Sequence, residues 1–153
     1  MKLNLTHPRD ALLGAQAGSM LLPVCDHYSG VEARMRKSLQ LQADMMAEFG
    51  ACVFDVTLDC EDGAPVGGEA DHAAMVVALV ALSAQKALQK ARVAVRVHAV
   101  SHPAFELDMA TIAGSVGQQL SHIMVPKVES VGDVVKAENA LMAASAADRK
   151  SVV

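Results

Sequence analysis

The stretch VFDVTLDCEDGAP, residues 53–65, decides the fold of this chain. Successive side chains of a β-strand point to opposite faces. One face therefore carries Phe54, Val56, Leu58 and Cys60, and the other carries Val53, Asp55, Thr57, Asp59 and Glu61. A turn rich in glycine and proline follows. We expect a strand over residues 51–62, with its apolar face on a core and its acidic face toward a polar space.

On both sides of this strand, short β-rich runs alternate with longer helical stretches. The other expected strands are LLPV (21–24), RVAVRVHAV (92–100) and HIMVPKV (122–128). The expected helices span residues 31–49, 69–90, 104–116 and 131–144. This alternation is typical of βαβ units and a parallel sheet.

Local signals set the ends of these helices. Ser29 and Glu32 have the spacing of a capping box at the start of helix 31–49, and Gly50 is a typical stop. Ser130 with Asp133 opens the last helix in the same way. The expected buried stripe of helix 31–49 consists of Val31, Met35, Leu39, Met45, Met46 and Phe49. Gly114 and Gly117 are expected to close helix 104–116.

Parallel strands with a polar column of side chains suggest a TIM-type barrel, whose active site lies at the carboxyl ends of the strands. A closed barrel needs eight strands and usually about 250 residues. The 153 residues hold four βα units. With no repeat or linker in the chain, the expected architecture is a single α/β domain over residues 1–153, the N-terminal half of a (βα)₈ barrel.

Composition excludes several classes of function. Aromatic residues make up 3% of the chain and the net charge is −4, which argues against stacking on bases and against binding phosphate backbones or acidic membranes. The longest apolar run, residues 73–82, is too short to cross a bilayer, and the polar residues after Lys2 are not expected to form a secretory signal. Three cysteines without a CxxC pair fit a cytoplasmic protein. A small-molecule site or a protein partner remains.

Three carboxylates, on Asp59, Glu61 and Asp62, lie within four positions at the end of the strand over 51–62. Such carboxylates repel one another and are costly to bury without a cation. Magnesium is the natural candidate because it prefers oxygen ligands and keeps several waters. The same residues also fit a solvated acidic turn, a common arrangement of Asp and Gly at strand ends.

Two cations could complete this site. Arg96 interrupts a valine-rich strand, and its guanidinium suits a substrate carboxylate or an oxyanion. The structural alternative is an ion pair with Asp59 or Glu61. Lys127, near the end of the strand over 122–128, could be a second cation, a Schiff-base amine or a solvated rim residue. His98 shares a strand face with Arg96 and is either a site residue or a hydrogen-bonded interior histidine.

Three motifs in this order, VFDVTLDCEDGAP (53–65), AVRVHA (94–99) and IMVPKVES (123–130), resemble the HpcH/HpaI aldolase and citrate lyase β-subunit-like family of carbon–carbon lyases. The resemblance covers residues 21–141. It implies a TIM-like barrel that uses Mg²⁺ to bind a 2-oxo acid. It also implies cleavage of a β-hydroxy acid or its coenzyme A thioester, as in citrate, malyl-CoA or citramalyl-CoA lyases.

By motif position, the resemblance implies that Arg96 contacts the substrate carboxylate or carbonyl. It implies that Glu61 and Asp62 hold metal-bound waters, and that Lys127 matches the lysine of the P-K-V-E motif. The family's direct magnesium ligands, a Glu and an Asp on later strands, would lie beyond Val153. Where the family usually has an asparagine after the strand arginine, this chain has His98.

Two other functions stay open. A half-barrel could act without catalysis as a binding or assembly module, since its open sheet edges favour pairing with itself or a partner chain. A homo-oligomer is expected. The chain could also belong to an aldolase that acts on 2-oxo acids without coenzyme A.

Overall fold

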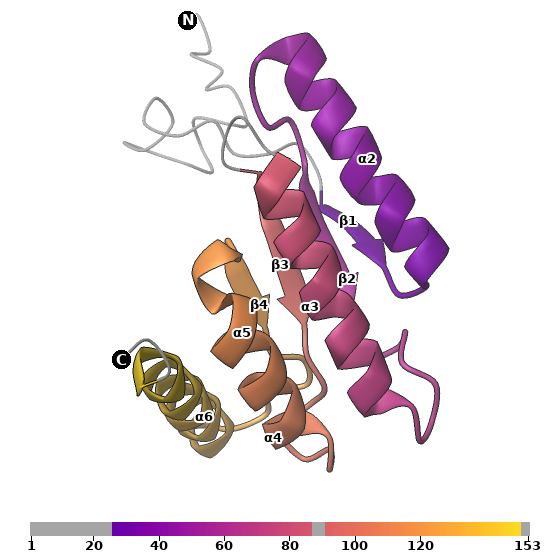
Figure 1. Cartoon of the computed structure of the whole chain (residues 1–153). Helices are drawn as coiled ribbons and strands as arrows, with labels where there is room; N and C mark the ends of the chain where they lie inside the picture. The colour runs from indigo at the N-terminus through magenta and orange to yellow at the C-terminus, as the bar shows by residue number, and fades with distance from the viewer. Residues whose placement is uncertain (1–25, 87–90, 151–153) are drawn as a thin grey trace, which may run out of the picture.

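A computed structural model describes residues 26–86 and 91–150 of the chain. Its sheet has four parallel strands in the order β1-β2-β3-β4, which is also their order along the chain (Figure 1). The strands are β1 (Asp26–Ser29), β2 (Asp55–Asp59), β3 (Val93–Arg96) and β4 (His122–Met124). The helices are α2 (Glu32–Phe49), α3 (Glu69–Lys86), α4 (Phe105–Asp108), α5 (Gly114–Val116) and α6 (Val131–Lys150). A π-helical turn, η2 (Met109–Ala113), joins α4 to α5, and a 3₁₀ turn, η3 (Gly117–Gln119), follows.

The helices α2, α3 and α4–α5 lie on one face of the sheet, and α6 packs against η2 and α5 (Figure 1). The core fills the space between these helices and the sheet. Its fully buried side chains include Met35, Val56, Leu58, Val95, Phe105 and Ile112. This is half of a (βα) barrel: consecutive parallel strands, each followed by helical structure on the outer face. The expected fold class is confirmed.

The register aligns the residues of neighbouring strands in rows across the sheet. Asp59 of β2 pairs with Arg96 of β3, which pairs with Met124 of β4, while Tyr28 of β1 pairs with Thr57. Because all four strands run parallel, their carboxyl ends meet at one edge of the sheet. The residues that follow Asp59, Arg96 and Met124 are therefore gathered at that edge.

The start of α2 differs from its prediction. The expected capping box is absent: Val31 is the N-cap without a side-chain cap, and the Ser29 hydroxyl lies 2.8 Å from the Ser38 hydroxyl. Ser29 is still part of β1, so its side chain faces the packed helix instead of the first turn. Glu32 accepts hydrogen bonds from Arg36. At the other end, Gly50 has φ 68°, as its role as a stop requires.

The buried face of α2 is more polar than the expected apolar stripe. Val31 and Phe49 are exposed, whereas Ser38 and Gln42 are buried beside Met35. The Gln42 amide donates to the carbonyl oxygens of Phe54 and Arg92. The Gln42 side chain thus provides hydrogen-bond donors to carbonyl groups just before β2 and β3. Buried polar groups need such partners, which explains why a polar residue occupies a core position.

Several element boundaries differ from those expected. The expected strand over 21–24 and residues 87–90 of the second helix lie outside the described residues, and the first described strand is β1. The strands β2, β3 and β4 are shorter than predicted. The third helix continues through Gly114 in helical conformation, since a glycine weakens a helix without ending it. The capping box at Ser130 and Asp133 is confirmed, and α6 extends to Lys150.

None of the helices in residues 26–86 and 91–150 is long and apolar enough to cross a membrane.

Candidate active site at the carboxyl edge of the sheet

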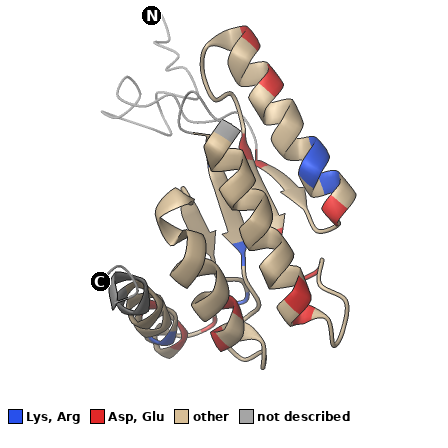
Figure 2. Cartoon of the chain, viewed as in Figure 1, with Lys and Arg blue, Asp and Glu red and all other residues tan. Residues whose placement is uncertain are grey.

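A cluster of charged side chains occupies the carboxyl edge of the sheet. We call it the edge cluster, and it consists of Asp59, Glu61, Asp62, Arg96 and Lys127. Figure 2 shows Lys and Arg segments at the ends of the strands, among the loops that follow them. Three carboxylates face two cations, so the cluster carries one net negative charge when all its groups are ionised.

Arg96 is the centre of the edge cluster. Its Nε donates to Asp59 Oδ1 at 2.8 Å and its Nη2 to Asp59 Oδ2 at 2.6 Å, a bidentate pair between neighbouring strands. Asp62 accepts a further bond from Nη2, and Glu61 Oε2 lies 3.2 Å from Nη1. The ion pair offered as the structural alternative for Arg96 is therefore present. The guanidinium is held in one orientation, which is also what an anion-binding site needs.

The two partners of Arg96 differ in exposure. The side chain of Asp59 is 7% exposed, whereas that of Asp62 is 70% exposed. Asp59 also accepts the backbone N–H groups of Glu61 and Asp62, so it fixes the turn as well as the guanidinium. Asp62 thus contacts the guanidinium from the solvent side, whereas Asp59 holds it from within the sheet edge.

Lys127 joins the edge cluster from the segment after β4. Its Nζ lies 2.7 Å from Glu61 Oε1, and its backbone has φ 53°. Positive φ is uncommon for a residue other than glycine and marks a backbone held by its surroundings. The left-handed conformation turns Lys127 toward β2, whereas regular alternation would have placed it on the side of Ile123 and Val125.

Electrostatics within the cluster favour the charged forms. Burial raises the pKa of Asp59, but the hydrogen bonds and charge of Arg96 and two backbone N–H groups outweigh burial and hold this pKa below its usual value. The hydrogen bond to Asp59 raises the pKa of Arg96. The hydrogen bond and charge of Glu61 raise the pKa of Lys127. All three groups are ionised at neutral pH.

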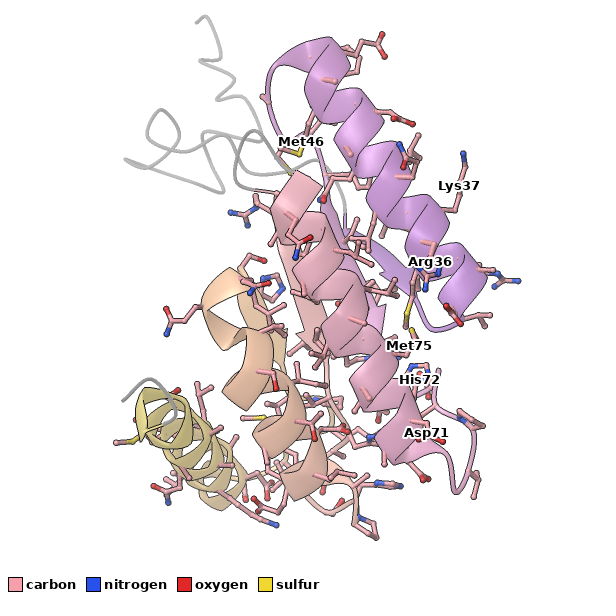
Figure 3. All side chains as sticks on the ribbon, viewed as in Figure 1. Arg36, Lys37, Met46, Asp71, His72 and Met75 are labelled. Carbon is pink, nitrogen blue, oxygen red and sulfur yellow. The ribbon has the colours of Figure 1, made fainter. Side chains whose placement is uncertain are left out.

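The loop after β2 and the start of α3 support the end of the strand. His72, labelled at this end of α3 in Figure 3, is buried, and its Nε2 lies 3.1 Å from the carbonyl oxygen of Asp59. Gly63 lies so close to Gly30 that an added Cβ would be 2.3 Å from the carbonyl oxygens of both Gly30 and Asp59. A glycine at position 63 therefore lets the acidic turn pack on the loop after β1.

His98 does not join the edge cluster. Its backbone N–H donates to Asp108 Oδ2 at 2.9 Å, and its ring Nδ1 lies 2.6 Å from the same oxygen. The ring also stacks on that of His102, with 4.3 Å between centroids. The structure thus shows a hydrogen-bonded interior histidine, one of the two alternatives for this residue.

Tyr28 borders the edge cluster, and sequence analysis missed it. The guanidinium carbon of Arg96 lies 5.7 Å from the centroid of the Tyr28 ring. The Tyr28 hydroxyl donates a hydrogen bond to Met124 Sδ at 3.0 Å. The sequence signal was available, because Tyr28 alternates with His27 and Ser29, whose side chains meet Ser38 of α2. Placing the first strand at residues 21–24 concealed this alternation.

The described residues do not form a direct magnesium site. They contain no group of three or more His, Cys, Asp or Glu side chains arranged to hold a metal ion. Each carboxylate of the edge cluster already contacts Arg96 or Lys127. Glu61 and Asp62 suit hydrogen bonds to the waters of an ion whose direct ligands come from elsewhere.

The consecutive parallel strands and the helices on one face of the sheet define half of a (βα) barrel. More specifically, the chain belongs to the HpcH/HpaI aldolase/citrate lyase family, whose model matches residues 38–152. This confirms the family resemblance carried by the three motifs.

One solved structure similar to this chain is a citrate lyase from Burkholderia xenovorans LB400, with 37% sequence identity and a TM-score of 0.69. The similarity covers 87% of this chain and 38% of the length of that protein's chain. None of the curated proteins matches this chain.

Proposed function

We propose that this chain supplies the anion-binding part of the active site of a magnesium-dependent carbon–carbon lyase. The reaction is the retro-aldol or retro-Claisen cleavage of a β-hydroxy acid or its coenzyme A thioester. The observation that carries the proposal is Arg96, which is fixed bidentately by Asp59 at the carboxyl edge of the sheet, beside the exposed carboxylate of Asp62. Family membership supports a lyase function.

In this reaction the β-hydroxyl group gives its proton to a base and becomes a carbonyl group, while the bond between the α and β carbons breaks. The electron pair of that bond passes to the acid or thioester fragment, which leaves as an enolate. Arg96 offers fixed N–H donors to a substrate carboxylate or to the oxygen that gains negative charge. Donors that are oriented before the reaction stabilise such charge without reorganisation.

A magnesium ion is also part of the proposed site. A bound divalent cation would polarise a carbonyl oxygen and help to offset negative charge. The edge cluster has one net negative charge and an acid substrate would add another, which supports a need for such a cation. We propose that Glu61 and Asp62 contact the ion through its waters and that Lys127 contributes to substrate binding.

Binding measurements on the chain test this proposal. We expect glyoxylate, pyruvate or oxaloacetate to perturb the NMR signals of the loops after β2 and β3, and Arg96→Gln to abolish the effect. Arg36→Gln is the matched control, because Arg36 is an exposed residue of α2 paired only with Glu32 among the described residues (Figure 3). Equal binding by the wild type and Arg96→Gln would contradict the proposal. Assays of malyl-CoA and citramalyl-CoA cleavage against the free acids would show whether coenzyme A is needed.

A non-catalytic assembly module is the second candidate. The sheet has two outer strands, β1 and β4, and none of the described helices covers the face opposite α2 and α3 (Figure 1). Open strand edges favour pairing with another chain. Light scattering coupled to size exclusion tests this candidate: a homo-oligomer that binds none of the three acids would favour assembly over catalysis.

A further inference from the structure

Tyr28 links the two outer strands of the described sheet, β1 and β4. Its hydroxyl on β1 donates to Met124 Sδ on β4 at 3.0 Å, although β2 and β3 separate these strands. Neighbouring strands lie about 4.8 Å apart, so three spacings in a flat sheet would keep these side chains apart. The contact therefore shows that the sheet curves around the phenol ring.

The Tyr28 ring lies beside the guanidinium that we propose to bind the substrate. The Arg96 guanidinium carbon is 5.7 Å from the ring centroid, and the Tyr28 residue is 43% exposed. The ring thus forms one accessible wall next to Arg96.

The hydroxyl group of Tyr28 has a weak partner. A thioether sulfur is a poor hydrogen-bond acceptor, whereas a charged oxygen accepts strongly. Exchange of Met124 Sδ for a carboxylate oxygen would strengthen the bond made by the hydroxyl. Such a group can be held in place before a ligand arrives and transferred to that ligand at small cost.

We propose that Tyr28 is a specificity-determining residue of the anion site, where its hydroxyl donates to an oxygen of a 2-oxo acid that Arg96 binds. This inference rests on the proposed function, because it needs an anion at Arg96. The ring limits the space beside the bound acid, and the hydroxyl selects ligands with an oxygen on that side.

Two conservative variants separate binding from folding. Tyr28→Phe removes the hydroxyl and keeps the ring, whereas Met124→Leu removes the sulfur and keeps the hydroxyl. A hydrogen bond to a charged group contributes enough that we expect Tyr28→Phe to weaken pyruvate binding about 10-fold or more. We expect Met124→Leu to leave the affinity unchanged or to raise it. NMR titration with pyruvate measures both effects.

The chain also carries its own optical probe. Tyr28 is the single tyrosine and there is no tryptophan, so tyrosine fluorescence reports on this position alone. We expect pyruvate to change the emission of the wild type and of Met124→Leu, but not that of Arg96→Gln.

The possible outcomes distinguish the two proposals. Wild-type binding with equal affinity in Tyr28→Phe would overturn the role of Tyr28 and leave the anion site intact. Equal losses in Tyr28→Phe and Met124→Leu would assign the hydroxyl to holding β1 against β4, and would also overturn this inference. Absence of binding by the wild type would overturn the proposed function and this inference with it.

Discussion

One carboxylate oxygen of Asp108 contacts two groups of His98: it accepts a hydrogen bond from the His98 backbone N–H at 2.9 Å and lies 2.6 Å from the ring Nδ1 of His98. Both side chains are buried, and His98 follows Arg96 by two residues. Asp108 lies where α4 passes into the π-helical turn η2, a local widening of the helix that often marks functional sites. The pair ties the chain just after β3 to the helical segment that follows it.

Replacement of Asp108 should destabilise the fold. We expect Asp108→Ala to lower the free energy of unfolding by about 2–4 kcal/mol, because it removes two hydrogen bonds and leaves buried polar groups unpaired. Urea denaturation measures the effect. Glu106→Ala is the control, since Glu106 is exposed on the same helix and should matter little. Equal stability of the two variants would contradict the structural role of Asp108.

Acid should weaken the contribution of Asp59 to stability. The folded protein holds the pKa of Asp59 below the value of the unfolded chain, so this carboxylate stabilises the fold at pH values above the unfolded pKa. That contribution is lost as the pH falls through the lowered, folded pKa. We expect the difference in unfolding free energy between the wild type and Asp59→Asn to be constant near neutral pH and to shrink below about pH 4. A difference that does not change with pH would contradict the ion pair.

The phenol of Tyr28 should respond in opposite directions to two substitutions. Burial and the charges of Asp26 and Asp59 raise the pKa of Tyr28, whereas the charge of Arg96 lowers it. We therefore expect Arg96→Gln to raise this pKa further and Asp26→Asn to lower it. The ultraviolet absorbance of the phenolate follows the titration, because the chain has one tyrosine. Circular dichroism confirms that each variant stays folded, and shifts of the same sign would disprove the arrangement.

A methyl group at position 63 should disrupt the acidic turn. In Gly63→Ala the new Cβ would lie 2.3 Å from two backbone carbonyl oxygens, which cannot move as a flexible side chain can. Overpacking of this kind typically costs about 1–3 kcal/mol. The matched control is Gly132→Ala in α6, where the nearest atom, Ser130 Oγ, is 3.5 Å away. Thermal unfolding compares the two, and equal melting temperatures would contradict the close approach of Gly63 to Gly30.

The sequence predicted the parts of the fold that depend on neighbouring residues. The alternation in residues 53–61 gave the polar face of β2, the glycine at position 50 ended α2, and Ser130 with Asp133 capped α6. Each of these signals acts within a few residues, so the periodicity of apolar residues and the turn residues are enough to predict the local structure. The capping box at Ser29 failed because a residue inside a strand cannot cap the next helix.

The sequence by itself determined that this chain alternates strands and helices, that Asp59 and Arg96 lie on polar strand faces, and that its motifs match one family of lyases. Only the tertiary structure decided that Tyr28 contacts Met124, that the Gln42 amide donates to the backbone carbonyl groups just before β2 and β3, and that Asp108 binds His98. The physical reason is distance along the chain. Local periodicity sets which face a side chain takes, whereas curvature of the sheet and packing of the helices set which side chain it meets there.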